Sequence, residues 1–314
     1  MKLNETGEGV EDALFIHSWE WILARERLFS IESHRSTKRI LELLKPIGEL
    51  ALLSRYISDN SSGTLKASAD RIMMFCWQEM DEGDLLRRVL AVRPDLLIFS
   101  TLYGTFYRSG LSNEELHEQI KKMRFTPSYF NVDLPAWRRL DLLHGMFAIG
   151  LAKEGDLKVA FNSTWLAGCY EPWTLSEATA YGLTHTIFYM TDYGAVEGLL
   201  PEAVLTYLKQ WLAVWENNYI DEGNLDLAAE MVMCRRCIGD ISGANKFCNS
   251  SLANLLEDGA VPGPELGAVG LLFGEEDPLK SVFYQNYHTT LVACMASFMQ
   301  SSFCEVKRTL QTIP

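Results

Sequence analysis

Apolar residues recur at spacings of three and four along most of the chain, which is the period of an amphipathic helix. The segment 10–29 is a clear example, because Leu14, Trp19, Ile22 and Phe29 fall on one broad side. The strict alternation that predicts strands occurs only in runs too short to count, such as residues 159–161. The pattern therefore predicts an all-α protein.

Glycines, prolines and helix-capping residues divide this pattern into about thirteen or fourteen helices. The predicted helices cover residues 10–29, 36–57, 65–80, 84–92, 95–107, 112–124, 134–152, 156–168, 176–194, 201–219, 224–238, 242–256, 278–298 and 303–310. Pro46 is expected to kink or divide the second helix, because an interior proline removes a backbone hydrogen bond. Ser112 and Glu115 have the separation of a capping box, which predicts the start of the helix that ends at Arg124.

Short connections between the predicted helices favour antiparallel neighbours. We expect a flexible tail at 1–9 and a single all-helical domain at 10–314, in which a sub-boundary could fall near 126–133. The helices are expected to form a multi-helix α/α toroid or a superhelix of antiparallel helical hairpins. No fixed-period repeat of the tetratricopeptide or ankyrin kind is present. We prefer the toroid, because the predicted helices have irregular lengths and kinks.

The helix predicted at 176–194 has two contrasting sides. Leu183, Ile187 and Met190 share one side at helical spacing, which indicates packing against the core. The other side carries Glu177, Tyr181, Thr184, His185, Phe188 and Asp192. An ordinary solvent-facing side would carry lysine, glutamate and glutamine instead. The pattern therefore predicts a polar pocket beside this helix.

Tyr181 and His185 lie one turn apart, so their side chains can touch. A phenol in contact with an imidazole can relay a proton near neutral pH. We therefore predict catalytic roles for His185 as general acid or base, for Tyr181 as its relay and for Asp192, which with Glu177 would place polar groups of the substrate. The alternative is that Tyr181 and His185 are core residues bonded to the backbone, while Asp192 caps the turn before Gly194.

Two further histidines are expected to complete the pocket from facing helices. His144 is followed by Gly145, which permits the close approach of another helix or a ligand. Asp141 lies one turn before His144 and could orient its imidazole. His288 falls in the first half of its helix, where toroidal folds can direct groups toward the centre. The alternative for both histidines is a structural role in the interior.

Metal binding is a further hypothesis for these residues. The three histidines with Asp192 or Glu177 could form a non-haem iron or zinc site. No spacing within the sequence fixes such a set, so the sequence assigns no metal ligand and no cofactor. Cys234 and Cys237 form a lone C-x-x-C without a second pair, which argues against structural zinc.

The composition of the 314 residues narrows the classes of partner and compartment. The chain has 41 acidic and 28 basic residues and a formal net charge of −13. An acidic surface repels phosphate backbones, so we expect no nucleic-acid partner. No apolar run reaches the length of a membrane-spanning helix, and no signal peptide is evident. Seven dispersed cysteines are typical of reduced thiols, so we expect a cytoplasmic protein without a membrane partner.

One segment carries a resemblance. LTHTIFYMTDYG, at 183–194 and preceded by Glu177, resembles a motif of an uncharacterised, chiefly actinobacterial all-helical family. The matching positions are Leu183, Thr184, His185, Phe188, Tyr189, Thr191, Asp192 and Gly194. The resemblance implies an all-helical fold and a setting in specialised metabolism, and it implies no particular activity.

The leading hypothesis is a cytosolic all-helical enzyme that acts on a small organic molecule by His-centred acid–base or metal-assisted chemistry. Phe188 and Trp173 would contact the substrate, and the glycine-rich loop 258–278 could act as a lid. The alternative is a non-catalytic helical scaffold that binds a protein or peptide in a groove. The two hypotheses differ in whether His144, His185 and His288 converge. The sequence assigns neither a substrate nor an oligomeric state.

Overall fold

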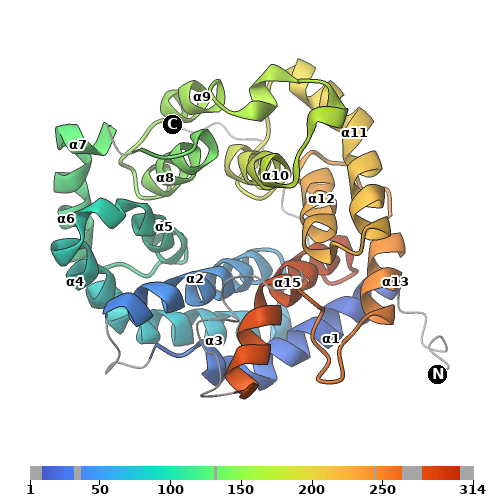
Figure 1. Cartoon of the computed structure of the whole chain (residues 1–314). Helices are drawn as coiled ribbons and strands as arrows, with labels where there is room; N and C mark the ends of the chain where they lie inside the picture. The colour runs from blue at the N-terminus through green and yellow to red at the C-terminus, as the bar shows by residue number, and fades with distance from the viewer. Residues whose placement is uncertain (1–8, 32–36, 131–132, 244, 264–277, 305–314) are drawn as a thin grey trace.

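The computed structural model describes residues 9–31, 37–130, 133–243, 245–263 and 278–304. These ranges are predominantly helical and contain no strand, which confirms the predicted all-α class (Figure 1). The helices are α1 (Val10–Ala24), α2 (Thr37–Asp59), α3 (Gly63–Glu79), α4 (Asp84–Val92), α5 (Ser100–Arg108), α6 (Glu114–Arg124), α7 (Pro127–Phe130), α8 (Ala136–Ala148), α9 (Glu154–Phe161), α10 (Glu177–Thr191), α11 (Glu202–Asp221), α12 (Leu225–Cys237), α13 (Asn245–Ala253) and α15 (Pro278–Gln300). Short 3-10 helices join several of them, including η3 (Pro94–Phe99), η4 (Trp165–Gly168) and η5 (Pro172–Thr174).

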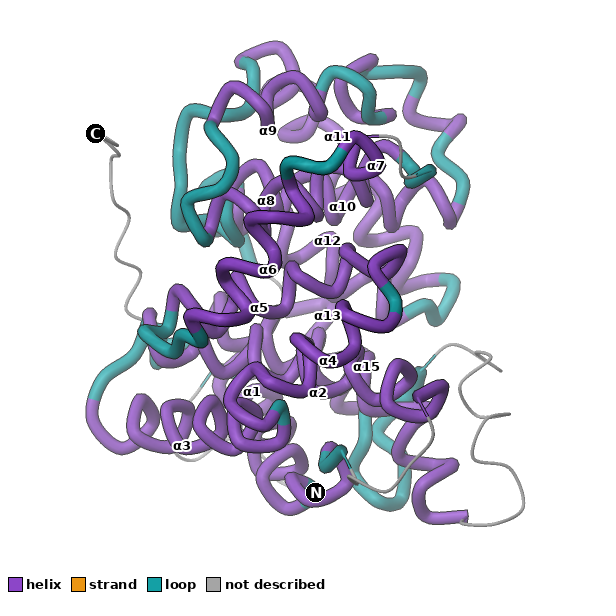
Figure 2. The backbone as a smooth tube through the Cα atoms, turned by 90° about the vertical axis from the view of Figure 1, so that its left-hand side faces the viewer, coloured by secondary structure: helices purple, strands orange, loops and turns teal. Residues whose placement is uncertain are grey.

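Six helices pack in a continuous circuit around a common centre. In order of contact they are α2, α5, α8, α10, α12 and α15, and α15 packs against α2 again. Figure 1 shows these helices arranged around the middle of the molecule. Further helices pack on the outside of the circuit, with α3 on α2, α9 on α8, α11 on α12 and α1 on α15. The view in Figure 2, turned by 90°, shows the same helices joined by loops.

The local sequence explains the limits of α10. The Ser176 hydroxyl accepts a hydrogen bond from the Thr179 amide and caps the N-terminus. At the other end, Asp192 has φ 44° and ψ 54°, a left-handed conformation that ends a helix. Leu183 and Ile187 are buried in the core, as the apolar stripe predicts. The cap and the left-handed turn therefore fix where α10 begins and ends, and so they fix the position of its polar stripe.

Two predicted helix features differ from the structure. Asn113, rather than Ser112, caps α6, because its side chain accepts a hydrogen bond from the Leu116 amide at 2.9 Å. The helix begins one residue later than predicted, so Glu115 is one position too early for a capping box. Pro46 does not divide α2, which continues from Thr37 to Asp59, so the expected division is wrong while a kink at Pro46 stays a prediction. The proline lies in a buried stretch of the helix, and packing there outweighs the lost hydrogen bond.

Several predicted segments fall wholly or partly outside the described residues. They are the tail at 1–9 except for its last residue, most of the loop at 258–278, and most of the helix at 303–310. Buried apolar residues on both sides of 126–133 belong to one contiguous core. Among the described helices, none combines the length and the apolar character required to cross a bilayer.

Candidate functional site

Two acids of α12 meet a histidine of α15 on the inner side of the circuit. Asp226 and Glu230 lie one turn apart on α12, so their carboxylates project from the same face. His288 of α15 faces them, and one ligand atom from each of the three residues lies within 4.8 Å of the others. Asp226 and Glu230 are only 2% and 3% exposed, whereas the His288 side chain keeps 27% of its surface accessible. We call Asp226, Glu230 and His288 the acidic triad.

Neighbouring helices hold each member of the acidic triad in place. The Tyr181 hydroxyl of α10 donates to Asp226 Oδ2 at 2.8 Å, and Thr289 donates to Asp226 Oδ1 at 3.2 Å. The Thr184 hydroxyl donates to Glu230 Oε2. His288 Nδ1 donates to Glu49 Oε2 of α2 at 3.0 Å. Four helices of the circuit therefore contribute to one polar cluster.

The close packing of these groups shifts their pKa values. Burial and the neighbouring Asp226 carboxylate raise the pKa of Glu230 to about 8. Burial disfavours a charged imidazole, but the carboxylates of Glu49 and Asp226 outweigh it and raise the pKa of His288 to about 9. Burial also opposes ionisation of Glu49, yet the charges of His288 and Lys45 lower the pKa of Glu49 to about 2.

His185 borders the acidic triad. Its Nδ1 lies 2.8 Å from the backbone carbonyl of Tyr181 and 3.8 Å from Glu230 Oε2. The ring packs against Trp137, with the ring centres 4.9 Å apart, and 24% of the side-chain surface remains accessible. Burial lowers the pKa of His185 to about 4. A neutral imidazole therefore stands beside the carboxylates at physiological pH.

A second polar cluster surrounds Asp192 at the end of α10. Arg108 of α5 donates to its Oδ2, Arg55 of α2 lies 3.5 Å from its Oδ1, and His144 of α8 donates from Nε2 to Oδ1 at 3.0 Å. Burial alone would raise the pKa of Asp192, but Arg55, His144 and Arg108 hold it well below its usual range. We call these four residues the Asp192 cluster.

The aromatic ring of Tyr189 connects the two clusters. Its centre lies 5.9 Å from the ring of His185 and 5.4 Å from the ring of His144. His185 and His288 thus meet around Glu230, while His144 belongs to the neighbouring Asp192 cluster. The three histidines face the interior from α8, α10 and α15.

The predicted contact between Tyr181 and His185 does not form. The Tyr181 hydroxyl reaches across to Asp226, and His185 bonds to the carbonyl of Tyr181 instead of its phenol. This backbone contact matches the alternative interpretation for His185. Asp141 was expected to orient His144, but it pairs with Arg138 at 3.2 Å. Asp192 takes the position beside His144, because the left-handed end of α10 directs its carboxylate toward α8.

The predicted substrate contacts occupy different surroundings. Phe188 is buried and its ring centre lies 5.9 Å from that of His185, so it forms part of the wall beside the imidazole. Trp173 lies in η5 and is 80% exposed. Glu177 is exposed in the first turn of α10, two turns before His185. Trp173 and Glu177 therefore face solvent, where neither closes over the acidic triad.

Sequence inspection missed the two acids of α12 as well as Glu49, Arg55 and Arg108. One signal was present for the acids: Asp226 and Glu230 are spaced by four in a helix whose other residues are largely apolar. Two acids on a helix that is buried on all sides require partners. Glu49, Arg55 and Arg108 had no such signal, because each is a single charged residue whose partner comes from a distant part of the chain.

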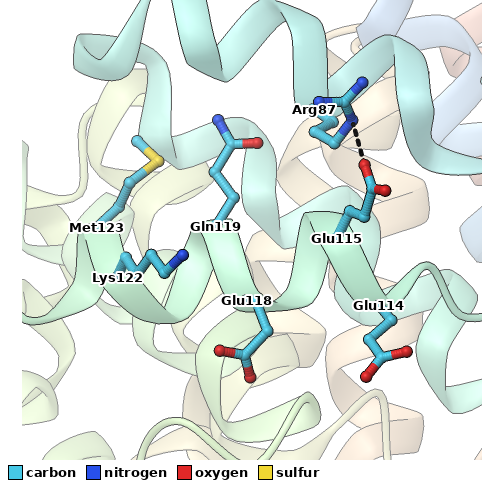
Figure 3. A pocket seen from close by; sticks show the side chains of 7 residues that line it. All are labelled: Arg87, Glu114, Glu115, Glu118, Gln119, Lys122 and Met123. Carbon is cyan, nitrogen blue, oxygen red and sulfur yellow. Dashed lines mark ion pairs between the residues drawn. The ribbon is translucent and has the colours of Figure 1, made fainter.

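A surface pocket lies apart from both clusters. It has a volume of about 520 Å³ and is formed by α4 and α6. Figure 3 shows its lining side chains, in which Arg87 Nε pairs with Glu115 Oε2 at 3.5 Å. The pocket contains none of the predicted site residues.

Comparison with known proteins places the chain in a family. The family model described as "Domain of unknown function (DUF6895)" matches residues 16–298, and the chain therefore belongs to this family. No curated protein and no solved structure matches the chain.

Proposed function

We propose that this member of the DUF6895 family is an enzyme that acts on a small organic molecule at the acidic triad, with His185 as the acid–base group. One observation carries the proposal: four inner helices bring three carboxylates and two histidines together. These are Glu49, Asp226, Glu230, His185 and His288. Functional sites are where perturbed ionisable groups are concentrated.

The architecture that we propose for this site is a closed α/α toroid. The circuit from α2 through α15 and back to α2 supports it. In a toroid the inner helices direct one face toward the centre, and His185, His288 and Glu49 lie on such faces. Each keeps about a quarter of its side-chain surface accessible, at 24%, 27% and 25%. A small molecule can therefore reach groups that are otherwise enclosed by helices.

Stability alone does not account for the acidic triad. Burying carboxylates is unfavourable, and well-packed apolar residues in place of a buried ionic group are often neutral or stabilising by about 1–4 kcal/mol. Asp226 and Glu230 are both buried, and each depends on hydroxyl donors from other helices for its hydrogen bonds. Residues that oppose stability in this way are typical of functional sites.

The hydrogen bonds of His185 define its chemical role. A carbonyl oxygen can only accept, so His185 Nδ1 must carry the proton that it donates to Tyr181. Nε2 then has a free lone pair and can take a proton from a substrate. Within the described part of the chain, Nε2 makes no hydrogen bond to protein. His185 is therefore prepared to act as a base, with the Tyr181 carbonyl fixing its orientation.

The scaffold hypothesis predicts a different structure from the enzyme hypothesis. It predicts an exposed apolar groove and histidines that lie apart. His185 and His288 lie around the same carboxylate, whereas His144 lies in the Asp192 cluster. The meeting of two of the three histidines at one carboxylate supports the enzyme over the scaffold.

The proposal can be tested by incubating the protein with a cellular small-molecule extract and following its components by mass spectrometry. We expect the wild-type protein to consume at least one component. His185→Gln should slow that reaction by about 100-fold or more, because a positioned acid or base contributes about 10²–10⁴-fold to a rate. His117→Gln is the matched control, since His117 lies on α6 outside both clusters. An unchanged rate in His185→Gln, or no component consumed by the wild type, would contradict the proposal.

A further inference from the structure

We infer that Asp226, Glu230 and His288 bind one divalent first-row transition-metal ion. This inference deepens the proposed function, and it rests on that function only for the use to which the ion is put. Two carboxylates and one imidazole combine ligands that suit manganese with one that suits zinc and iron. Three protein ligands leave coordination positions open for water or a substrate, as in catalytic metal sites.

The spacing of the ligand atoms supports the inference. His288 Nε2 lies 3.6 Å from Asp226 Oδ1, which is too long for a hydrogen bond. Two atoms that each lie about 2.1 Å from one ion are separated by about 3.4 Å at a tetrahedral angle and about 3.0 Å at a right angle. The observed separation is therefore close to that of two ligands sharing an ion. One ligand atom of Glu230 also lies within 4.8 Å of the ligand atoms of Asp226 and His288.

Two atoms of the acidic triad have no hydrogen-bond partner among the described residues. In the described ranges, His288 Nε2 makes no hydrogen bond, and Thr184 is the hydrogen-bond partner of Glu230 through Oε2, which leaves Oε1 without one. Glu230 is 97% buried, since only 3% of it is exposed. Neither atom is among the fully enclosed polar atoms that lack a partner, so both are accessible to a water or an ion.

The neighbours of the triad are those that orient metal ligands. Metal-binding histidines commonly donate their second ring N–H to a carboxylate, which fixes the tautomer. His288 Nδ1 donates to Glu49 in this way, so Nε2 is the ring nitrogen that can exchange its proton for an ion. Tyr181 and Thr289 hold the Asp226 carboxylate through its two oxygens. Each ligand is therefore fixed before an ion arrives.

The inference is tested with the full-length protein, stripped of metal by a chelator and titrated separately with Zn²⁺ and Mn²⁺. Calorimetry should show one ion bound per chain, and elemental analysis after dialysis should show the same ratio. Glu230→Gln should weaken binding by more than about 100-fold, and Glu49→Gln, which acts through His288, by about 10–100-fold. His144→Gln is the control, because it belongs to the Asp192 cluster, and its affinity should equal that of the wild type.

The outcomes separate this inference from the proposed function. No binding of either ion, or equal binding by Glu230→Gln and the wild type, would overturn the inference while leaving turnover of the small molecule intact. If Glu230→Gln does not fold, anomalous diffraction from zinc-soaked wild-type crystals decides the question. An ion between Asp226, Glu230 and His288 supports the site, and an ion elsewhere or none refutes it.

Discussion

The direction of individual hydrogen bonds determines what the interior histidines can do. His185 donates from Nδ1 to a carbonyl, and His288 donates from Nδ1 to the Glu49 carboxylate. Both rings therefore present Nε2 to a substrate or an ion, with a free lone pair in His185 and with a proton that an ion must displace in His288. This assignment follows from the acceptors alone, and it explains how two similar side chains can take different roles, one as a base and one as a ligand.

Asp192 has a structural role that one substitution can isolate. Asp192→Asn keeps the size of the side chain and tolerates the left-handed backbone, but it removes the charge that faces Arg55, Arg108 and His144. We expect a loss of about 3–5 kcal/mol in the free energy of unfolding, because Arg108 loses its carboxylate partner and Arg55 is left with the exposed Asp59. Denaturant unfolding measures this loss. Asp95→Asn removes the partner of Arg93 at an exposed pair and should leave the unfolding curve unchanged.

The contribution of Asp192 to the free energy of unfolding should depend on pH. The pKa of Asp192 is lowered in the folded protein, so its charge stabilises the fold at pH values above the unfolded pKa of about 3.9. That contribution is lost as the pH falls through this value toward the folded pKa. The difference in unfolding free energy between wild type and Asp192→Asn should therefore be constant near neutral pH and shrink below about pH 4. A difference that persists undiminished in acid would show that the charge is not its source.

At the scale of residues, the sequence predicted which helix carries the polar stripe but not the partners of its side chains. His185 and Asp192 both face the interior, as the period of the stripe indicates. The spacing of Tyr181 and His185 allows their side chains to touch. In the structure, however, the Tyr181 hydroxyl bonds to Asp226 and the His185 ring bonds to the Tyr181 carbonyl. Spacing along one helix shows which groups can meet, and the acceptors supplied by other elements decide which do.

At the scale of elements, α5 and α8 show how a glycine sets the distance between two helices. A Cβ added at Gly145 would lie 2.7 Å from Thr101 Cα, and one added at Gly104 would lie 3.1 Å from the Gly145 carbonyl oxygen. The expectation that Gly145 permits the approach of another helix is therefore confirmed. This close crossing places His144 beside the end of α10.

Gly145→Ala should therefore destabilise the protein. The added methyl meets backbone rather than a movable side chain, so we expect a loss of about 1–3 kcal/mol despite the better helix propensity of alanine. Thermal or denaturant unfolding provides the measurement. Gly155→Ala in α9 is the matched control, because no atom lies within 4 Å of its added Cβ, and its stability should be equal to or above that of the wild type. Equal stability of the two variants would refute the close crossing.

Helix positions were largely predictable, because the hydrophobic period and the glycine, proline and capping residues that end helices are local properties of the sequence. The limits of α4 agree with the prediction at 84–92, and α11 begins one residue after Pro201. The predicted helices at 95–107 and 156–168 each separate into a 3-10 segment and an α-helix. The cap of α6 was misplaced by one residue, since Ser112 and Asn113 are both good caps and only the backbone conformation distinguishes them.

At the scale of the whole molecule, the circuit joins segments that are far apart in sequence. Glu49 of α2 meets His288 of α15 across 239 positions, and Arg55 meets Asp192 across 137. No pattern in a single sequence reports such contacts, so the acidic triad could not be assembled from the sequence. The packing order of the helices creates the site, and each inner helix contributes at least one polar group to the two clusters.

The most direct measurement of the central claim is a crystal structure of His185→Gln with the small molecule that the wild-type protein consumes. The variant should bind this molecule without converting it. We predict density for the molecule on the inner side of the helix circuit, in contact with the acidic triad. Density at the pocket between α4 and α6, or elsewhere on the outer surface, would contradict the account.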